Sequence, residues 1–520
     1  MINKVFNSKF IAQVHLALIA TLLCVLIGCA TINQQSEQES IRVNHAFRSG
    51  SLLTASNLLD KNFKIENLQE AKKNSQVDTT YFLEKGLFLS LLGSKNLHSS
   101  TQSLLVADQF LRDWESQVSL SLRMTPSEFS NTLRDKFYFK RVYLPRDYEK
   151  TFINYQIALN HATARRYDLA LVAANQLRDR EELIRQALQK ELDGSRANVR
   201  AQMSNPRNKG YGSSVNAVDK IPNYDMSALN DPEVATLKNA YQNAAAYYLT
   251  GFIYEQDNNP SNAAISYKNA AEIAPQVDLF QKSWDEIRKP MVSRDPNMSD
   301  VLLVIDAGFL GDVYSFKARI PFFTPSGPKI VSWVVPAIRK NTSFYQPSRV
   351  TIGKEPIVLT RVLNVQTMAS KDLKDRMPGY IASAVASSIV QVVAQEVTAR
   401  AIDNSAKQNQ SRSNQNNQNP YGDIFKAISA VAISEIAAGD VDTRMWRSLP
   451  AEVYMARLSL PKGEHQITIP TRLGPRVLGI SMVNNYEIIH ARIFDNGVVS
   501  LQNSNRFLGE SEYSISGSVK

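Results

Sequence analysis

The chain has 520 residues, a formal net charge of +10 and only two cysteines, Cys24 and Cys29. This length allows a sizeable buried core and more than one domain. Because both cysteines lie near the N-terminus, a fold held together by several disulfides is excluded. The basic residues form no dense Lys/Arg run, which argues against a nucleic-acid-binding arm.

The N-terminus has the layout of a secretion signal. Lys4 and Lys9 precede the apolar run 16–27, and no acidic residue occurs before Cys29. The apolar run is too short for a comfortable membrane span. We therefore predict a signal peptide over residues 1–28, whose removal leaves a mature charge of 10 − 2 = +8.

The end of this segment, Leu26-Ile27-Gly28-Cys29, resembles the lipobox of bacterial lipoproteins. The resemblance implies that the Cys29 thiol carries a diacylglycerol and that Cys29 becomes the acylated (palmitate-type) first residue. Ala30 replaces the aspartate that retains such proteins at the inner membrane, which favours the periplasmic face of the outer membrane. The alternative is an uncleaved signal anchor with a chance cysteine. Residues 29–40 are polar and predict a tether.

The segment 41–295 has a helical, repetitive pattern. Its clearest unit, over 244–275, resembles a tetratricopeptide repeat (TPR). The resemblance implies that a small residue on the first helix faces the second helix and that large aromatics fill the gaps beside it. The residues in these packing positions are Tyr247, Gly251, Tyr254, Ala263, Tyr267, Ala270 and Pro275.

Looser repeat units are predicted at 50–59 (with Ala55 in the small position), 82–114 and 155–177. We expect about four helix pairs forming an α-solenoid, whose concave face would bind a peptide or protein surface. Residues 193–232 predict a long loop that is functional or disordered. The basic excess between 165 and 209 is interpreted as a solvated helix face leading into this loop, with a specific anion site as the alternative.

From residue 300 the pattern changes to strands, predicting an antiparallel β-rich domain over 300–520 and an α+β protein overall. Strands are expected at 301–306, 313–320, 329–338 and 356–365. Five more, at 452–460, 466–470, 477–483, 487–494 and 498–502, predict a meander with turns at Lys462-Gly463, Asn484-Asn485 and Asn496-Gly497.

A helical insertion over 371–438 interrupts these strands. We predict helices at 373–401 and 424–438, joined by an Asn/Gln/Ser-rich disordered link over 403–420. The small apolar stretch 381–393 could suggest a membrane-inserting hairpin. Gln391, Gln395 and Glu396 shorten its apolar length, so we favour a helical hairpin buried against the sheet.

The arrangement as a whole resembles a family of uncharacterised proteobacterial outer-membrane lipoproteins with TPR-type repeats and a β-rich C-terminal domain. The segments that carry the resemblance are 148–159 (YEKTFINYQIAL), 371–378 (KDLKDRMP) and 442–451 (DTRMWRSLPA). Members tend to be encoded near lipoprotein activators of peptidoglycan synthases. The resemblance therefore implies cell-envelope maintenance, and it supplies no catalytic residues.

No metal-ligand spacing, P-loop or nucleophile elbow is present in the sequence, and we expect no metal and no cofactor. Asp372, Asp375, Asp440 and Asp442 could supply a carboxylate pair for sugar hydrolysis. Helix capping by Asp372 is the favoured alternative. Arg444 and Trp446 form a candidate recognition loop, or they pin that loop to the sheet.

Our preferred hypothesis is a non-enzymatic scaffold. It is lipid-anchored in the outer membrane and binds a periplasmic or outer-membrane protein, but no nucleic acid. One alternative is an enzyme that acts on peptidoglycan through the C-terminal carboxylates. Another is a secretion or surface component that self-assembles into a homo-oligomer.

Overall fold

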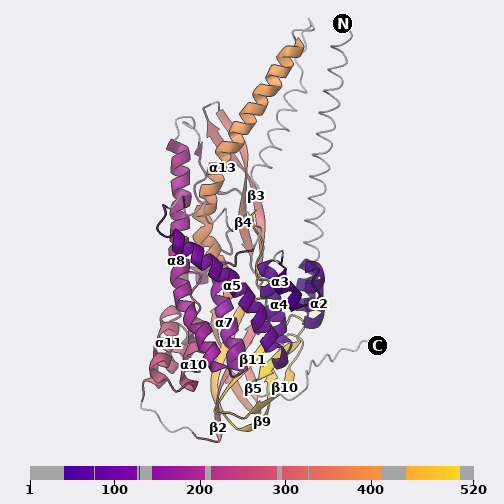
Figure 1. The fold of residues 1–520 in the computed structure, drawn as a ribbon, viewed down its shortest axis with the longest axis vertical. Helices are drawn as coiled ribbons and strands as arrows, with labels where there is room; N and C mark the ends of the chain where they lie inside the picture. Colours follow the sequence, from indigo (N-terminus) through magenta and orange to yellow (C-terminus); the bar gives the residue numbers. More distant parts are fainter. Residues whose placement is uncertain are drawn as a thin grey trace, which may run out of the picture. The chain divides into compact units, whose positions relative to one another are not determined.

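The computed structural model describes residues 40–74, 77–125, 128, 143–204, 212–289, 295–325, 327–410 and 441–503. The chain divides into two compact units, Met1–Val77 and Asp78–Lys520 (Figure 1). The predicted signal peptide and Cys29 lie outside the described residues.

The first unit is helical where it is described. Residues 40–48 form a helix, followed by α2 (Leu52–Phe63) and α3 (Leu68–Lys73). α2 corresponds to the helix predicted over 50–59, and Ala55 in its small position is fully buried. α3 begins after Asn67, whose side chain accepts hydrogen bonds from two backbone N–H groups of the first helical turn.

The second unit begins with helices, three pairs of which pack closely: α4 with α5, α7 with α8, and α10 with α11. The helices before the long strands are α4 (Thr79–Leu91), α5 (Leu97–Ser121), α7 (Asp147–Thr163), α8 (Tyr167–Ser204), α9 (Pro232–Thr236), α10 (Ala244–Gln256), α11 (Pro260–Ile273) and α12 (Asp278–Ile287), with short 3-10 turns at Ser94–Asn96 and Val218–Lys220.

Two of these pairs use a glycine to let the helices approach. A Cβ atom on Gly86 of α4 would lie 2.6 Å from the Leu104 side chain of α5. A Cβ atom on Gly251 of α10 would lie 2.5 Å from the Tyr267 ring of α11. The close contact expected at Gly251 is therefore present, and Gly86 repeats it earlier in the chain.

The C-terminal part of the second unit contains three sheets. The five-stranded sheet has the order β12-β11-β2-β8-β7, the four-stranded sheet β10-β9-β5-β6, and the three-stranded sheet β1-β3-β4. The strands are β1 (Gly212–Ser213), β2 (Met298–Ala307), β3 (Asp312–Thr324), β4 (Gly327–Arg339), β5 (Arg349–Ile352), β6 (Glu355–Val358), β7 (Thr360–Asn364), β8 (Glu452–Pro461), β9 (Gly463–Ile469), β10 (Arg476–Met482), β11 (Tyr486–Ile493) and β12 (Val499–Asn503).

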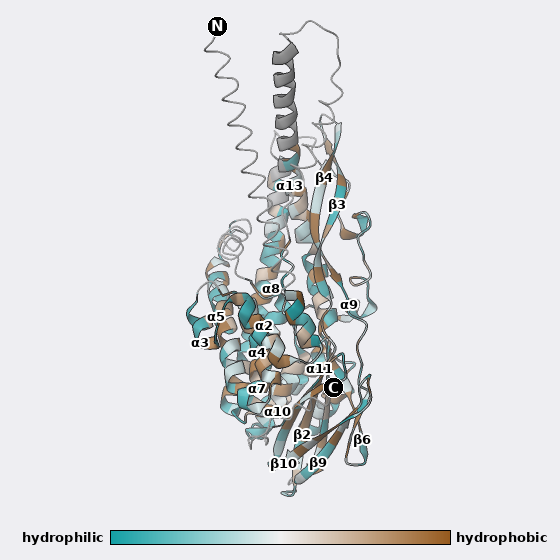
Figure 2. Ribbon diagram, turned by 90° about the vertical axis from the view of Figure 1, so that its right-hand side faces the viewer, coloured by the Kyte–Doolittle hydropathy of each residue, from teal (hydrophilic) through white to brown (hydrophobic). Residues whose placement is uncertain are grey.

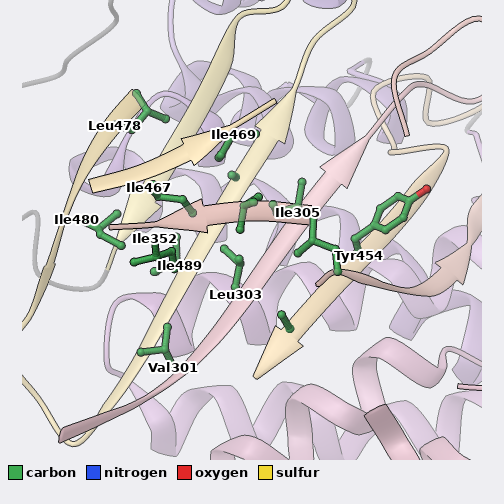
Figure 3. Close-up of a cluster of buried hydrophobic side chains, with 14 of the residues drawn as sticks. Val301, Leu303, Ile305, Ile352, Tyr454, Ile467, Ile469, Leu478, Ile480 and Ile489 are labelled. Atoms are coloured by element: carbon green, nitrogen blue, oxygen red, sulfur yellow. The ribbon is translucent and has the colours of Figure 1, made fainter. Parts of the chain in front are cut away.

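The main apolar core lies between the five-stranded and four-stranded sheets (Figure 3). Val301, Leu303 and Ile305 of β2 point into it, opposite residues such as Ile467 of β9 and Ile480 of β10. The other face of the five-stranded sheet packs on helices, including α7 and α10. Being buried on both faces explains why β2 is an unbroken apolar run rather than an alternating strand.

The long helix α13 (Val365–Gln410) packs on β4 and on α8 (Figures 1 and 2). Ile381, Ala384, Ser388 and Gln391 are buried, so the small apolar stretch is used for packing within the chain. Among the described residues, no helix combines the length and apolar character needed to cross a bilayer.

The mixed α+β architecture agrees with the sequence prediction, but several details differ. β11 pairs with β2 in parallel, so the predicted antiparallel meander is wrong. β2 is an interior strand with β8 on one side and β11 on the other. β9 and β10, which lie between β8 and β11 in sequence, belong to the four-stranded sheet. The single strand predicted over 356–365 is instead β6 and β7, which lie in different sheets.

The helix boundaries also differ from prediction. α13 begins at Val365 rather than 373, because the Asn364 side chain accepts a hydrogen bond from Thr367 N at 3.0 Å and caps the helix. Residues 403–410 of the predicted disordered link are the end of α13, while 411–420 and the helix predicted at 424–438 lie outside the described residues. α8 continues to Ser204, so the predicted loop begins later.

Candidate functional site

The three segments that carry the family resemblance meet in one buried polar cluster in the second unit. It joins α5, α7, α8 and α13 to the loop 442–447 through hydrogen bonds and ion pairs. We call this cluster the junction network. Its members are Asp108, Glu115, Tyr143, Arg146, Asp147, Tyr148, Glu149, Lys150, Asn154, Arg180, Glu191, Asp372, Arg376, Arg444 and Trp446.

Glu149 is the centre on the α7 side. Its carboxylate accepts hydrogen bonds from Arg146 N at 2.9 Å, from Trp446 N at 2.8 Å and from the Tyr143 and Tyr148 hydroxyls. The bond from Arg146 N is one half of a capping box that begins α7. Burial raises the pKa of Glu149 against the opposing effects of Arg146 and these hydrogen bonds. One carboxylate therefore both starts a helix and holds a distant loop.

Arg376 is the centre on the α13 side. Its guanidinium forms ion pairs with Asp147, with Glu191 at 2.7 Å and with Asp372 at 3.3 Å. Burial alone would raise the pKa of Asp147, but the charges of Arg376 and Lys150 outweigh it and hold that pKa below its usual value. For Asp372, burial and the nearby Asp147 charge prevail over Arg376 and raise the pKa to about 6.

Arg180 of α8 extends the network to α5. It forms ion pairs with Asp108 at 2.7 Å and Glu115 at 2.5 Å, and donates to Asn154 Oδ1 at 2.7 Å. Lys150 lies 3.8 Å above the centre of the Trp114 ring of α5. The basic pattern between 165 and 209 predicts a solvated helix face that includes Arg180, but the Arg180 side chain is only 2% exposed.

The loop 442–447 is pinned to α7 and to the start of α4. Trp446 is fully buried, with its ring edge-on to that of Phe152 at 6.0 Å. Arg444 pairs with Asp78 at 2.7 Å and with Asp442 at 2.6 Å. Of the two predicted alternatives, pinning describes this loop, although its partners are helices rather than the sheet.

Glu84 of α4 holds the next residues of the same loop. Its carboxylate accepts a hydrogen bond from Arg447 N at 2.7 Å. Burial raises the pKa of Glu84 to about 7, with hydrogen bonds from Ser448 and the charge of Arg447 acting in the opposite direction.

The three aspartates of the enzyme hypothesis that the structure describes each contact a basic side chain. Asp372 lies inside α13 and shares Arg376 with Asp147, so it does not cap the helix. Asp375 pairs with Lys371 at 2.7 Å, and Asp442 pairs with Arg444. Asp440 lies outside the described residues. The described members therefore lie in three different ion pairs and do not form one carboxylate pair.

The residues predicted to pack within the repeat lie on α10 and α11 or directly after α11. Ala263, Tyr267 and Ala270 of α11 are fully buried, and Pro275 follows the end of that helix. Tyr247 donates a hydrogen bond to Glu181 of α8 at 2.9 Å, and Tyr254 donates to Asn175 at 2.8 Å. These hydroxyls join α10 to α8.

One face of α10 is covered by the five-stranded sheet. The Phe252 ring packs edge-on against Tyr486 of β11 at 5.6 Å. Arg457 of β8 bridges Glu255 of α10, at 2.7 Å, and Asp300 of β2, at 2.6 Å. A partner therefore cannot use this face without displacing part of the chain's own sheet.

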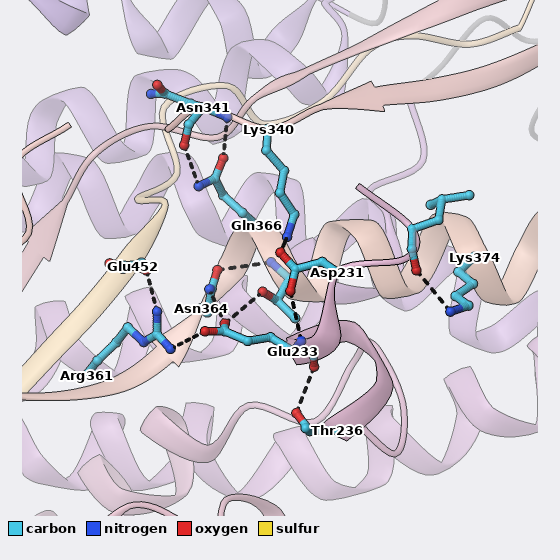
Figure 4. A network of polar contacts seen from close by, with 12 residues as sticks. Asp231, Glu233, Thr236, Lys340, Asn341, Arg361, Asn364, Gln366, Lys374 and Glu452 are labelled. Carbon is cyan, nitrogen blue, oxygen red and sulfur yellow. Dashed lines mark hydrogen bonds and ion pairs between the residues drawn. The ribbon is translucent and has the colours of Figure 1, made fainter. Parts of the chain in front are cut away.

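The end of the loop predicted over 193–232, together with α9, is held along α13 and the neighbouring strands (Figure 4). Glu233 pairs with Arg361 at 2.6 Å and accepts a hydrogen bond from Asn364 Nδ2 at 2.7 Å. Asp231 pairs with Lys340 at the end of β4. Arg361 also pairs with Glu452 of β8 at 2.8 Å. This second network fixes α9 to the start of α13.

The described residues contain no group of three or more His, Cys, Asp or Glu side chains arranged to hold a metal ion. The buried His490 instead pairs with Asp306 at 3.0 Å, and both residues lie on adjacent strands of the five-stranded sheet.

Comparison with protein-family models, with curated proteins and with solved structures finds no significant match to this chain.

Proposed function

We propose that this protein is a lipoprotein anchored through Cys29 to the outer membrane, where it acts as a non-catalytic scaffold in cell-envelope maintenance or assembly. In this proposal the three helix pairs belong to a TPR-like solenoid, and a periplasmic or outer-membrane protein is the partner. The lipobox resemblance at 26–29 and the resemblance of the whole chain to envelope lipoproteins support this assignment.

The observation that carries the scaffold proposal is that the arginines at the centre of the junction network pair with carboxylates of the same chain. Arg376 and Arg180 form ion pairs with carboxylates of α5, α7, α8 and α13 within the same chain. Buried ion pairs of this kind add little net stability over apolar packing, but breaking one is costly, so they favour a single arrangement of helices. Such an interior suits a rigid support better than a site that turns over a substrate.

The covered face of α10 changes where a partner would bind. Phe252 and Glu255 already contact the five-stranded sheet. We therefore place partner binding on outward surfaces of the helix pairs, where Leu105 of α5, Val172 of α8 and Ile265 of α11 are 40%, 55% and 54% exposed.

The test is affinity capture from cross-linked envelopes with the tagged protein and a Cys29→Ser control. Specific envelope proteins should be enriched only with the anchored form. A second comparison uses Val172→Asp, which changes an exposed side chain and leaves the interior intact. Capture that is the same for wild type and Cys29→Ser would contradict the anchored scaffold.

The enzyme alternative has its own assay. Purified protein is incubated with peptidoglycan, and soluble fragments are measured for wild type, Asp372→Ala and Asp442→Ala. We expect no release above a heat-treated control. Release that is abolished by either substitution would replace the scaffold proposal with the enzyme.

A further inference from the structure

The β3–β4 hairpin has two very different faces. Ile320, Phe322 and Val331 are fully buried on one face. On the same face, Trp333 donates a hydrogen bond from Nε1 to Ser388 Oγ of α13 at 2.8 Å. α13 therefore anchors one side of the hairpin.

The opposite face carries exposed apolar side chains near the turn. Pro321 lies opposite Ile330, and Phe323 lies opposite Pro328, as neighbouring cross-strand pairs. Phe323 is 50% exposed and Ile330 is 53% exposed, and both prolines are exposed as well. We call these four residues the tip face. Large apolar side chains gathered in pairs on a fixed support differ from single exposed residues scattered over a surface.

Basic residues accompany the tip face. Lys317 and Arg319 are exposed on the same face of β3, directly before Pro321. Together β3 and β4 contain four basic residues and one acidic residue, Asp312. Asp312 is at the far end of β3, where it pairs with Arg447 at 2.8 Å. Arg339 lies opposite Asp312 at that far end, whereas Lys317, Arg319 and Lys329 lie closer to the turn, so the hairpin residues near the tip face carry a net positive charge.

The outer edge of β4 is poorly suited to adding another strand. The side-chain amide of Gln391 hydrogen bonds to both the N–H and the C=O of Ser332, at 3.2 and 3.1 Å. Pro328 and Pro336 occupy equivalent outward positions and have no N–H to donate. Tyr224 donates a hydrogen bond to the Pro336 carbonyl at 2.8 Å. This edge therefore disfavours a partner that pairs with β4 as an additional strand.

We propose that the tip face docks on the surface of an anionic lipid bilayer. Phe323 and Ile330 would enter the boundary between headgroups and acyl chains, while Lys317 and Arg319 contact anionic headgroups. An aromatic and an aliphatic side chain beside basic residues is the composition that binds such surfaces. This docking goes beyond the proposed function and does not depend on acylation of Cys29.

The experiment places an environment-sensitive fluorophore at the tip face of the full chain. Cys24→Ser and Cys29→Ser remove both native thiols, and Phe323→Cys supplies a single labelling position. The protein is reconstituted into vesicles of phosphatidylethanolamine and phosphatidylglycerol, and separately into phosphatidylcholine vesicles, each with and without a lipid-borne quencher. Val358→Cys is the matched control, because Val358 is 75% exposed on β6.

Docking predicts blue-shifted emission and lipid quenching at position 323 in the anionic vesicles, and neither at position 358. Each basic side chain near an anionic surface contributes about fivefold to the docking equilibrium. Lys317→Ser with Arg319→Ser should therefore lower the docked fraction relative to the free form about thirtyfold.

Three results would overturn the docking: a label at 323 that stays in water, equal quenching at 323 and 358, or protection of 323 only after envelope proteins are added. The last result would assign the tip face to a protein partner. None of these outcomes bears on capture through the helix pairs, so failure here is distinguishable from failure of the scaffold proposal.

Discussion

Replacing Glu181 with glutamine should stabilise the protein at alkaline pH and leave it unchanged at low pH. Glu181 of α8 is buried, and it accepts hydrogen bonds from the Tyr247 hydroxyl at 2.9 Å and from Asn243 N at 3.3 Å. Burial raises the pKa of Glu181 from 4.5 to about 7, against the smaller opposing effects of these two hydrogen bonds. Glutamine has the shape of the protonated acid: its Oε1 can accept from Asn243 N, and its amide N–H can donate to the Tyr247 hydroxyl oxygen, which reverses the direction of that hydrogen bond.

The sign and size of the effect follow from proton linkage. Below pH 4.5 Glu181 is protonated in both the folded and the unfolded chain, so it makes no difference to stability. Between pH 4.5 and about 7 only the unfolded chain loses the proton, and stability falls as pH rises. At about 1.4 kcal/mol for each tenfold change in proton affinity, the full loss above pH 7 is about 3 kcal/mol.

The assay is urea unfolding followed by tryptophan fluorescence, for wild type and Glu181→Gln, at pH 4.5 and pH 8. Glu84 also has a pKa of about 7, but it is present in both proteins, so their difference isolates Glu181. Glu182→Gln is the matched control. Glu182 is half exposed and pairs with Arg185 at 2.6 Å, so its replacement should bring no gain at pH 8. An identical pH dependence for wild type and Glu181→Gln would refute the reasoning.

Three further substitutions test the packing. Gly251→Ala should destabilise by about 1–3 kcal/mol, because the new Cβ would lie 2.5 Å from the buried Tyr267 ring. Gly479→Ala is the matched control and should leave the stability unchanged, because a Cβ at Gly479 would meet open space. Equal changes in melting temperature for Gly251→Ala and Gly479→Ala would contradict the close contact between Gly251 and Tyr267. Arg376→Met should lower the free energy of unfolding, measured in urea, by about 3–5 kcal/mol, because it leaves buried carboxylates without a compensating charge. A loss below about 1 kcal/mol would show that these carboxylates are solvated. Trp446→Ala should cost about 3–5 kcal/mol by opening a cavity, and unchanged unfolding would show that the loop is not pinned.

The parts of the fold that could be predicted are those with local causes. The α10–α11 pair is predictable because the small residues Gly251 and Ala263 are close in sequence and imply a close approach of two helices, although the side chain that contacts Gly251 is that of Tyr267. The strand at 313–320 is predictable because its side chains alternate between two faces, although β3 continues to Thr324 and its pairing with β4 was not predicted. Partner choice between distant strands has no such local signature, which is why the parallel pairing of β2 with β11 was missed.

The junction network could be anticipated only in part. The segments 148–159, 371–378 and 442–451 were recognised, but nothing in their spacing indicates that they meet. Arg180 has the same local context as its exposed neighbour Arg185, and only the distant Asp108 and Glu115 distinguish it. Helix capping is predicted for Asp372 because it directly precedes the predicted helix start at 373, whereas α13 already begins at Val365.

The position of β2 in its sheet has a consequence for how the chain folds. Its neighbours on either side come from much later in the chain, as shown by the contacts of Asp300 with Arg457, 157 residues away, and of Asp306 with His490, 184 residues away. Closing such long loops is slow, and it must precede the gain from pairing. The apolar run Val301–Ile305 therefore stays unpaired and prone to aggregation until β8 and β11 have been synthesised, which is when almost the entire chain is present. Truncation after β10 would remove β11, so even a small C-terminal deletion should cause insolubility rather than partial function.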